Sequence, residues 1–255
     1  MSVPETDRQF VTALARGLEL LRAFRRGERY LGNGELAQRS GLAKATVSRL
    51  THTLIELGYL EYSPAMGKYS LGVGVLALGY AYLSGMSLRE AARPLMDDLA
   101  TATESTVVLG AREHLHMVCL EVCQGHPLFR LNLDVGVRVP HGLTALGRAQ
   151  LCGLPEAQRA EWLERYRADS AAAEWPALER SILQSQLDYQ ELGFCYSLGE
   201  WNREVYAVGV PLLAADGSGT LALSLSGPAI KMTKERLLGE LGPYLCGLRD
   251  RLQLV

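Results

Sequence analysis

The sequence predicts an α+β protein in two parts, a small helical part that ends in a β-hairpin and a larger domain of mixed helices and strands. Three observations predict it. Apolar residues recur every three to four positions through residues 10–54, short alternating segments flank a Pro/Gly turn within residues 57–71, and strand-like and helix-like segments interleave beyond residue 87. With 255 residues, 48% of them hydrophobic, the chain is long enough for two cores.

The first part begins with a helix whose apolar positions are Phe10, Leu14, Leu18, Leu21 and Phe24. Two short amphipathic helices follow over residues 33–54 and are hinged at Gly41, where a residue without Cβ takes a positive φ at little cost. One apolar stripe joins the pair, made of Leu36, Ala37, Leu42, Val47, Leu50 and Leu54. This pattern is typical of a helix-turn-helix.

Burial of that stripe turns a polar face of the second helix outward. Its residues are Lys44, Ala45, Thr46, Ser48, Arg49, His52 and Thr53. Such a face fits a major groove about 12 Å wide, where long cations reach guanine edges or phosphates and short side chains pack on the backbone. The face therefore predicts binding to double-stranded DNA. The alternative is an ordinary helical hairpin with a solvated face.

A β-hairpin is predicted directly after the second helix, with its turn at residues 63–67. A hairpin in this place is the wing of a winged helix, and Lys68 on it is expected to touch a phosphate. The winged helix-turn-helix domain then spans residues 5–71. Residues 1–71 hold 10 Lys and Arg against 7 Asp and Glu, whereas residues 72–255 hold 16 against 21. This modest positive excess implies few phosphate contacts per subunit, so useful affinity needs two or more copies.

Residues 72–86 form a predicted linker helix that is apolar on nearly every side. Such a helix must be covered on every side, and we expect it between the two domains, against a partner from another subunit. Its apolar run, Val73 to Leu83, is too short to cross a bilayer, which needs about 20 residues. Because residues 1–8 are polar and the five Cys are scattered, we expect a cytoplasmic protein with no membrane segment.

The second domain, residues 87–255, is predicted to be one curved antiparallel sheet with helices packed against it. The predicted helices are 88–102, 144–151, 156–167, 175–192 and 234–252, and Pro94 allows only a kink or a late start in the first of them. The predicted strands are 106–111, 115–122, 128–133, 194–197, 205–213 and 220–226.

Three segments make the chain resemble the isocitrate lyase regulator (IclR) family of transcription factors over essentially its whole length. They are LAKATVSRL at 42–50, VPHGLTALGRA at 139–149 and LSLSGP at 223–228, and their order and spacing together are specific. The resemblance implies a ligand-responsive repressor or activator, a homodimer or homotetramer, that binds an operator on double-stranded DNA. It also implies a C-terminal domain that binds a small organic or aromatic acid.

The residues themselves are compatible with such a pocket. Thr144 and Ala145 open a helix, whose N-terminus offers N–H groups to a carboxylate, and Ser224 and Ser226 face the same way on one strand, unless they lie on a solvated sheet face. The family pattern adds apolar walls at Leu128 and Leu131 and a loop-to-helix corner at Ala145 and Leu146. The predicted effector-binding set is Leu128, Leu131, Thr144, Ala145, Leu146, Ser197, Ala207, Ser224 and Ser226.

Three positions depart from the family pattern. A His often found at the position of Gly142 stands one residue earlier, at His141, a frequent carboxylate is Ser197 here, and a frequent Cys is Ala207. The loss of an acid and a thiol predicts a larger, aromatic acid rather than a tiny keto acid. Trp201 is a candidate lid, with simple packing as the alternative.

Metal binding and catalysis are the two other kinds of chemistry that the residue types could support. Five residues of metal-ligand type lie within 13 positions, namely His114, His116, Cys119, Cys123 and His126. None of them has the paired spacing of a structural zinc site. Strand alternation would place His114 with His116, and Cys119 with Cys123, on shared faces that serve equally as core or edge positions. We therefore predict no metal and no cofactor. Enzyme motifs such as a nucleophile elbow or a phosphate-binding loop are missing, so no catalytic residue is predicted. A small-molecule sensor or metal-binding protein whose helix-turn-helix makes only protein contacts is the remaining alternative.

Overall fold

The computed structural model describes residues 9–125, 131–170, 174–213 and 219–253. The chain divides into two compact units, one up to Gly85 and one from Met86 onward, and each is described by itself. The predicted fold class is confirmed: an N-terminal helix-turn-helix precedes an α+β unit with an antiparallel sheet. Among the described residues, no helix combines the length and hydrophobicity that a membrane span requires.

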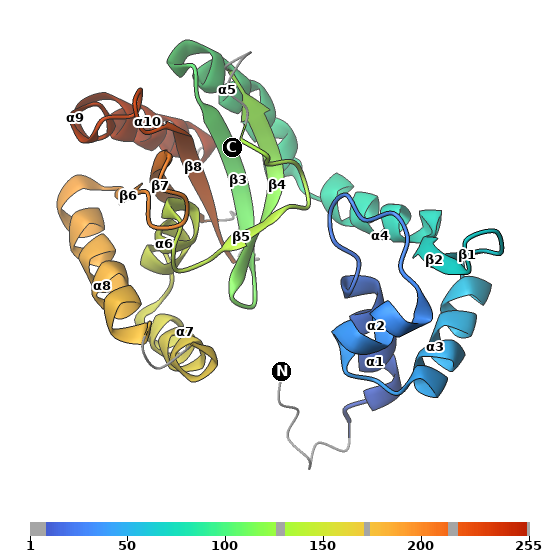
Figure 1. Ribbon diagram of the computed structural model, residues 1–255. Helices are drawn as coiled ribbons and strands as arrows, with labels where there is room; N and C mark the ends of the chain where they lie inside the picture. The colour runs from blue at the N-terminus through green and yellow to red at the C-terminus, as the bar shows by residue number, and fades with distance from the viewer. Residues whose placement is uncertain (1–8, 126–130, 171–173, 214–218, 254–255) are drawn as a thin grey trace. The chain divides into compact units, whose positions relative to one another are not determined.

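Before helix α4 (Val73–Ser84), the described residues of the first unit form three helices and a two-stranded antiparallel sheet (Figure 1). They are α1 (Thr12–Arg22), α2 (Asn33–Ser40), α3 (Lys44–Glu56), β1 (Leu60–Ser63) and β2 (Lys68–Leu71). Gly41 ends α2 with φ 69°, a left-handed conformation that suits glycine, and so makes the turn into α3. The core between these elements is a cluster of Leu20, Leu31, Leu36, Ala37, Val47, Leu54 and Leu60.

The predicted buried face of α1 is partly wrong. Leu14 and Leu18 are 62% and 48% exposed, and the helix turns Gly17 and Leu20 to the core instead. The helix has apolar residues on two sides, and within this unit α2 and α3 cover one of them. The spacing of apolar residues could not tell which side that is.

Helix α4 (Val73–Ser84) follows the hairpin, and none of its residues is buried within the described chain. Its start packs closely, because a Cβ on Gly72 would lie 2.4 Å from the carbonyl oxygen of Gly58. Its large apolar side chains are nevertheless exposed, namely Val73, Leu76, Leu78, Tyr80 and Tyr82.

The second unit is a six-stranded antiparallel sheet with helices on both faces. Its strands are β3 (Thr106–Glu113), β4 (His116–Gln124), β5 (Arg138–Pro140), β6 (Cys195–Leu198), β7 (Val205–Leu213) and β8 (Thr220–Pro228), in the spatial order β5-β4-β3-β8-β7-β6. Its helices are α5 (Ser87–Thr103), α6 (Ala145–Cys152), α7 (Glu156–Asp169), α8 (Trp175–Leu192), α9 (Lys234–Arg236) and α10 (Gly242–Leu252), with a π-helical segment, Leu237–Leu241, before α10.

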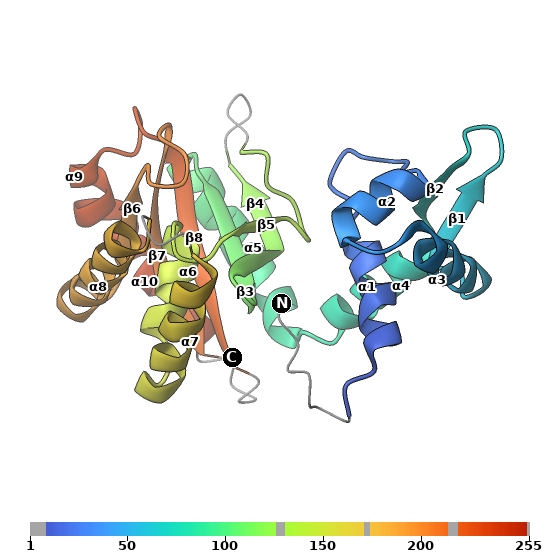
Figure 2. The same cartoon turned by 60° about the horizontal axis from the view of Figure 1, so that its bottom comes forward.

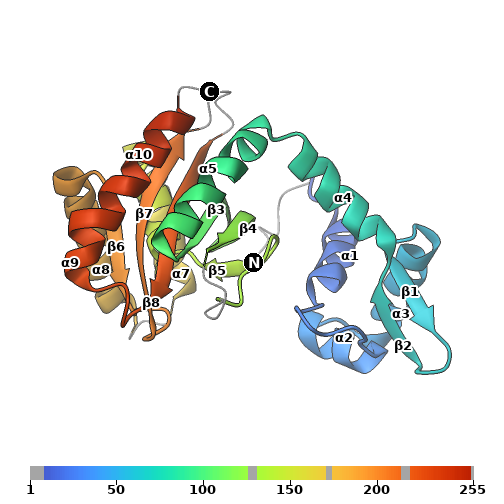
Figure 3. The ribbon, with the colours of Figure 1, turned by 90° about the horizontal axis from the view of Figure 1, so that it is seen from above.

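Two helix layers enclose the sheet. Helices α5 and α10 lie side by side on one face (Figure 3), whereas α6 lies on the other face, next to α8, with α7 further along (Figure 2). Helix α5 runs from Ser87 through Pro94, so it does not start late.

The predicted strand at 128–133 is wrong over its described part. Residues 128–130 lie outside the described residues, and Leu131 and Leu133 are buried in the core without belonging to a strand. The edge strand is β5 instead. Gly136, with φ 84°, turns the chain back onto β4 and donates its N–H to the carbonyl of Cys119. The apolar residues were recognised, but this turn decided which residues join the sheet.

Candidate functional site

Helix α3 presents the predicted polar face to solvent. Lys44, Ala45, Ser48, Arg49, His52 and Thr53 are exposed, and Thr46 is half-buried. The Ser48 hydroxyl accepts a hydrogen bond from Asn33 Nδ2 at 2.8 Å and donates to the carbonyl of Lys44 at 3.1 Å. Ser48 therefore ties the start of α2 to α3, in addition to lying on the outer face.

Lys68, which was expected to touch phosphate, makes an ion pair within the unit. Its Nζ lies 3.1 Å from Oε2 of Glu35, which also accepts the N–H of Gly32 at 2.8 Å. These hydrogen bonds, from Gly32 first and then from Lys68, lower the pKa of Glu35. The charge of Lys68 is thus shared with α2, and the turn of the wing at residues 63–67 carries no charged residue.

In the second unit, three residues of the predicted effector-binding set lie in one row across three neighbouring strands. Ser197 on β6 pairs with Ala207 on β7, and Ala207 pairs with Ser226 on β8. The small side chain of Ala207 leaves room between the two hydroxyls. In the neighbouring row Gly209 lies beneath α6, where a Cβ would be 2.4 Å from the carbonyl oxygen of Ala145. The first turn of α6 therefore rests directly on the sheet.

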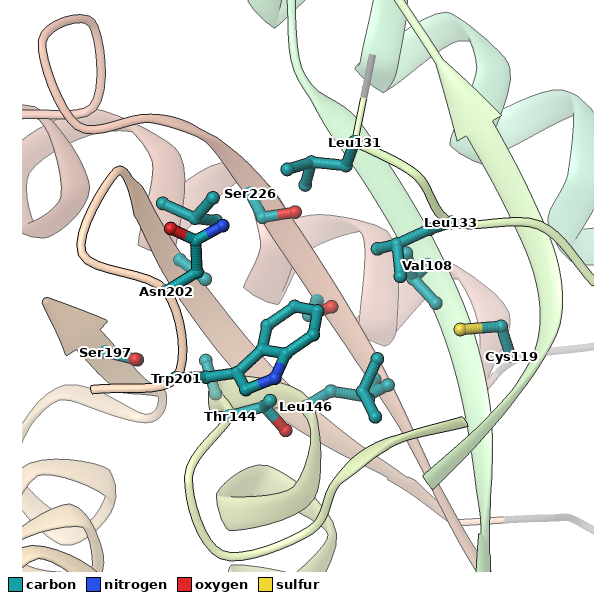
Figure 4. Close-up of a pocket in the computed structure, with 15 residues that line it drawn as sticks. Val108, Cys119, Leu131, Leu133, Thr144, Leu146, Ser197, Trp201, Asn202 and Ser226 are labelled. Carbon is teal, nitrogen blue, oxygen red and sulfur yellow. The ribbon is translucent and has the colours of Figure 1, made fainter. Parts of the chain in front are cut away.

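These elements surround a pocket of about 480 Å³ that opens to solvent (Figure 4). It is lined by Val108, Cys119, Leu131, Leu133, Val139, Thr144, Ala145, Leu146, Ser197, Trp201, Asn202, Val205, Ala207, Ser224 and Ser226. Every described residue of the predicted effector-binding set is in this lining, and Leu128 lies outside the described residues. A concave, mainly apolar lining with a few polar groups is the usual form of a small-molecule site.

Sequence reasoning missed six lining residues: Val108, Cys119, Leu133, Val139, Asn202 and Val205. Strand alternation on β3 and β8 could have found Val108, which lies opposite Ser224. The others come from separate segments that meet only in the folded unit. In Figure 4 the ring of Trp201, the candidate lid, lies among the other lining residues, and Trp201 is 41% exposed.

The pocket offers hydrogen-bond donors but no charged lining residue among those described. Thr144 Oγ1 donates to the carbonyl of Pro140 and caps α6 by accepting the N–H of Gly147. The N–H groups of Ala145 and Leu146 in the same turn have no partner within the helix, as at any helix start. The Ser224 hydroxyl has no partner among the described residues. An anion here would be held by neutral donors and by the helix dipole.

An ion pair with one buried partner holds Ser197 of the pocket lining in place. Arg148 on α6 is 2% exposed, and its Nη1 lies 2.8 Å from Oε1 of Glu200. The other oxygen of Glu200 accepts the hydroxyl of Ser197 and the N–H of Leu198, each at 2.7 Å. Partial burial alone would raise the pKa of Glu200, but the charge of Arg148 and these hydrogen bonds outweigh it and lower the pKa. The loop that carries Trp201 is thereby tied to α6.

His141 does not reach the pocket. Its ring is buried against Trp162, with 4.4 Å between the ring centroids, and Nε2 lies 2.9 Å from Oε1 of Gln150. Burial lowers the pKa of His141 from 6.5 to about 3, although the hydrogen bond to Gln150 opposes the shift. Gly142, the other position singled out, packs against Leu178 and Tyr166.

Acidification should therefore destabilise the second unit through His141. The unfolded chain takes up a proton near pH 6.5 and the folded chain only near pH 3, so the neutral ring stabilises the fold above 6.5 and stability falls as the pH drops below that value. The expected loss at pH 5.5 relative to pH 7.5 is about 1.4 kcal/mol. Urea unfolding at both pH values measures it, and H141Q should lose this component. An equal pH dependence in both proteins would contradict the assignment.

Strand alternation predicted that Cys119 and Cys123 share one face of their strand, and this prediction is wrong. The pairing of β3 with β4 shifts between Leu109 and Gly110, whose partners are Glu121 and Cys119, so Leu120 is an extra residue. Such a bulge reverses the alternation. Cys119 therefore lines the pocket, whereas Cys123 contacts the carbonyl of Arg93 on α5. Burial raises the pKa of Cys119 to about 12 and that of Cys123 to about 11.

No group of three metal-ligand side chains that could hold an ion is found within the described ranges, and His126 lies outside them.

Comparison with known proteins decides the family. Residues 13–64 match the model of the IclR helix-turn-helix domain, and residues 80–246 match that of the bacterial transcriptional regulator IclR C-terminal domain. The chain belongs to the IclR family. It is therefore a DNA-binding transcription regulator with an effector-binding domain, and not an enzyme.

Several relatives match this IclR-type chain over nearly its whole length. The HTH-type transcriptional regulator TsaQ1/TsaQ2 of Comamonas testosteroni is 35% identical over 94% of this chain and 87% of its own. The crystal structure of an IclR family regulator from Brucella abortus is 40% identical, with TM-score 0.90, and covers 100% of this chain and 95% of its own. An IclR homologue from Microbacterium hydrocarbonoxydans, complexed with 4-hydroxybenzoate, shares the fold at 22% identity with TM-score 0.71, covering 96% of this chain and 100% of its own.

Proposed function

We propose that this IclR-type regulator controls a catabolic operon for a small organic or aromatic acid, and that this acid binds in the pocket of the second unit. The observation that carries the proposal is the lining: apolar walls, N–H groups at the start of α6 and the free hydroxyl of Ser224 converge on one open space. Neutral donors and a helix N-terminus bind a carboxylate, and the walls suit an apolar body. The 4-hydroxybenzoate complex of the homologue agrees with this class of ligand.

The proposed control passes through two subunits. Helix α4 exposes five large apolar side chains, and a second copy of the same helix would cover them in a homodimer, or in a homotetramer of two such pairs. The two α3 helices would then read successive major grooves of a near-palindromic operator. An effector that prefers one arrangement of the α4 helices shifts the equilibrium toward that arrangement, by as much as the free energy of its preference. The spacing of the two α3 helices changes with it.

Arg49 is a proposed base-reading residue on the exposed face of α3. Replacing it with Ala should weaken operator binding by about 1 to 3 kcal/mol if it makes a bidentate contact to guanine. A salt-dependent mobility shift with the DNA upstream of the chain's own gene measures the change. E56A, at the exposed end of α3, is the matched control and should leave affinity nearly unchanged. Unchanged affinity in R49A would remove Arg49 from the contact surface.

The double variant S224A/S226A should blunt the effector response while DNA binding persists, because it removes two hydroxyls from the pocket and leaves α3 untouched. The expected loss is about tenfold in acid affinity, about 1.4 kcal/mol. Thermal shift with a panel of small carboxylates and phenolic acids identifies a ligand, and titration of wild type and variant then gives the ratio. A normal response in the variant would place the effector elsewhere.

A further inference from the structure

The hydrogen bonds of Ser197 set the polarity of one end of the pocket. A serine hydroxyl has one proton to donate and two lone pairs. The proton of Ser197 is already given to Glu200 Oε2 at 2.7 Å, and no described residue donates to its oxygen. Because Ser197 lines the pocket, it presents lone pairs there and no proton.

Glu200 is held in a form that keeps this arrangement. Its carboxylate is fixed by Arg148 on one oxygen and by the N–H of Leu198 on the other. Loss of its charge would leave Arg148, which is almost fully buried, without its counter-ion. The lowered pKa of Glu200 agrees with an ionised acceptor at neutral pH. Ser197 is therefore a fixed donor toward Glu200 and a fixed acceptor toward the pocket.

Thr144 has likewise given its proton away, to the carbonyl of Pro140. The remaining polar groups of the lining can donate. The first-turn N–H groups of α6 and the hydroxyl of Ser224 can donate. The Asn202 amide uses its oxygen to accept the N–H of Glu204 and keeps its NH₂ group as a donor. Ser226 makes only a long bond, 3.4 Å, to the carbonyl of Thr106, so its hydroxyl can turn either way. These donors thus suit a carboxylate, whereas the hydroxyls of Ser197 and Thr144 do not; Thr144 already accepts the N–H of Gly147, and nothing described donates to Ser197.

We infer that Ser197 selects ligands with a hydrogen-bond donor remote from the carboxylate, so that the effector class is a hydroxylated acid. This deepens the proposed function and rests on it. Ser197 and Ser226 flank Ala207 across two strand spacings, which is about 10 Å between backbones. That separation leaves room for a single ring over Ala207. Its hydroxyl would point toward Ser197 and its carboxylate toward α6 and Ser224, which pairs with Gly209 in the neighbouring row. Arg148 and Glu200 are positioning residues in this scheme.

The test compares acids that differ only in whether the ring carries a hydroxyl group, which can donate a hydrogen bond, or a fluorine, which cannot. Isothermal titration of the full-length protein uses 4-hydroxybenzoate against 4-fluorobenzoate, and 3-hydroxybenzoate against 3-fluorobenzoate. In at least one pair the hydroxylated acid should bind about tenfold more tightly to wild type, because the fluoro acid leaves a buried acceptor unpaired. S197A should reduce the preference to within about twofold and leave the affinity for the fluoro acid nearly unchanged.

A second variant separates polarity from shape. In E200Q, with the amide oxygen on Arg148, an NH₂ group takes the place of Oε2, so the N–H of Leu198 loses its acceptor. Ser197 then accepts from the amide instead of donating, which frees its proton to turn into the pocket. The preference for the hydroxylated acid should then fall although Ser197 is still present. E161Q, which neutralises an exposed ion pair with Arg165, is the matched control and should keep the wild-type preference.

Each outcome bears on the inference. Equal binding of both members of each pair by wild type, or a preference that survives in S197A, would overturn the role of Ser197 and leave acid binding intact. Failure of all four acids to bind folded wild-type protein would overturn the proposed aromatic effector class together with this inference.

Discussion

Replacing Gly209 with Ala is expected to lower the free energy of unfolding of the second unit by about 3 kcal/mol or more. A Cβ at this position would lie 2.4 Å from the carbonyl oxygen of Ala145 and 3.1 Å from the Cβ of Ala149. Real Cβ atoms essentially never approach backbone so closely, and a helix that is packed on a sheet cannot yield as a flexible side chain does. Helix α6 must therefore lift away from β7.

This displacement should also change the pocket, because the first turn of α6 forms one of its walls. Chemical unfolding monitored by circular dichroism measures the loss of stability, and titration with a bound acid measures the change in affinity. The matched control is G247A in α10, where a Cβ meets nothing within 4 Å, and it should be neutral or stabilising by up to about 1 kcal/mol. If G209A were as stable as G247A, the close packing of α6 on β7 would be contradicted.

Leu36 should be one of the sensitive positions of the helix-turn-helix. L36A is expected to cost about 2 to 5 kcal/mol, because the side chain is fully buried and its removal leaves a cavity. The cluster contains seven buried hydrophobic residues among those described, Leu36 included, so its removal takes away a sizeable part of a small core. A loss of this size removes a large part of the stability of a small unit.

The readout for L36A is operator binding together with the thermal unfolding profile. DNA binding should be lost or strongly weakened, while acid binding by the second unit is retained. L57A is the matched control in the same unit, because Leu57 is 62% exposed and should change stability by less than about 0.5 kcal/mol. Full operator affinity in L36A at the growth temperature would contradict the proposed dependence of α3 on this core.

Local patterns were enough to predict the helix-turn-helix and most of the sheet. The stripe through Leu36, Val47 and Leu54 and the turn at Gly41 depend on near neighbours in the chain, which the sequence displays directly. The strands β7 and β8 could be recognised for the same reason, and their alternation placed Ser224 and Ser226 together in the pocket. The family resemblance supplied Ser197 and Ala207, which no local pattern could have joined to them.

The sequence by itself thus determined the two-part architecture, the outward face of α3 and, besides the candidate lid Trp201, eight of the fifteen described residues that line the pocket. Only the tertiary structure decided the contacts between distant segments. The pairing of Arg148 with Glu200, 52 positions apart, gives Ser197 its polarity, and one extra residue in β4 sends Cys119 and Cys123 to opposite faces. Periodicity reports which residues share a side of one element, but not which other element covers that side, because coverage depends on packing across the whole chain.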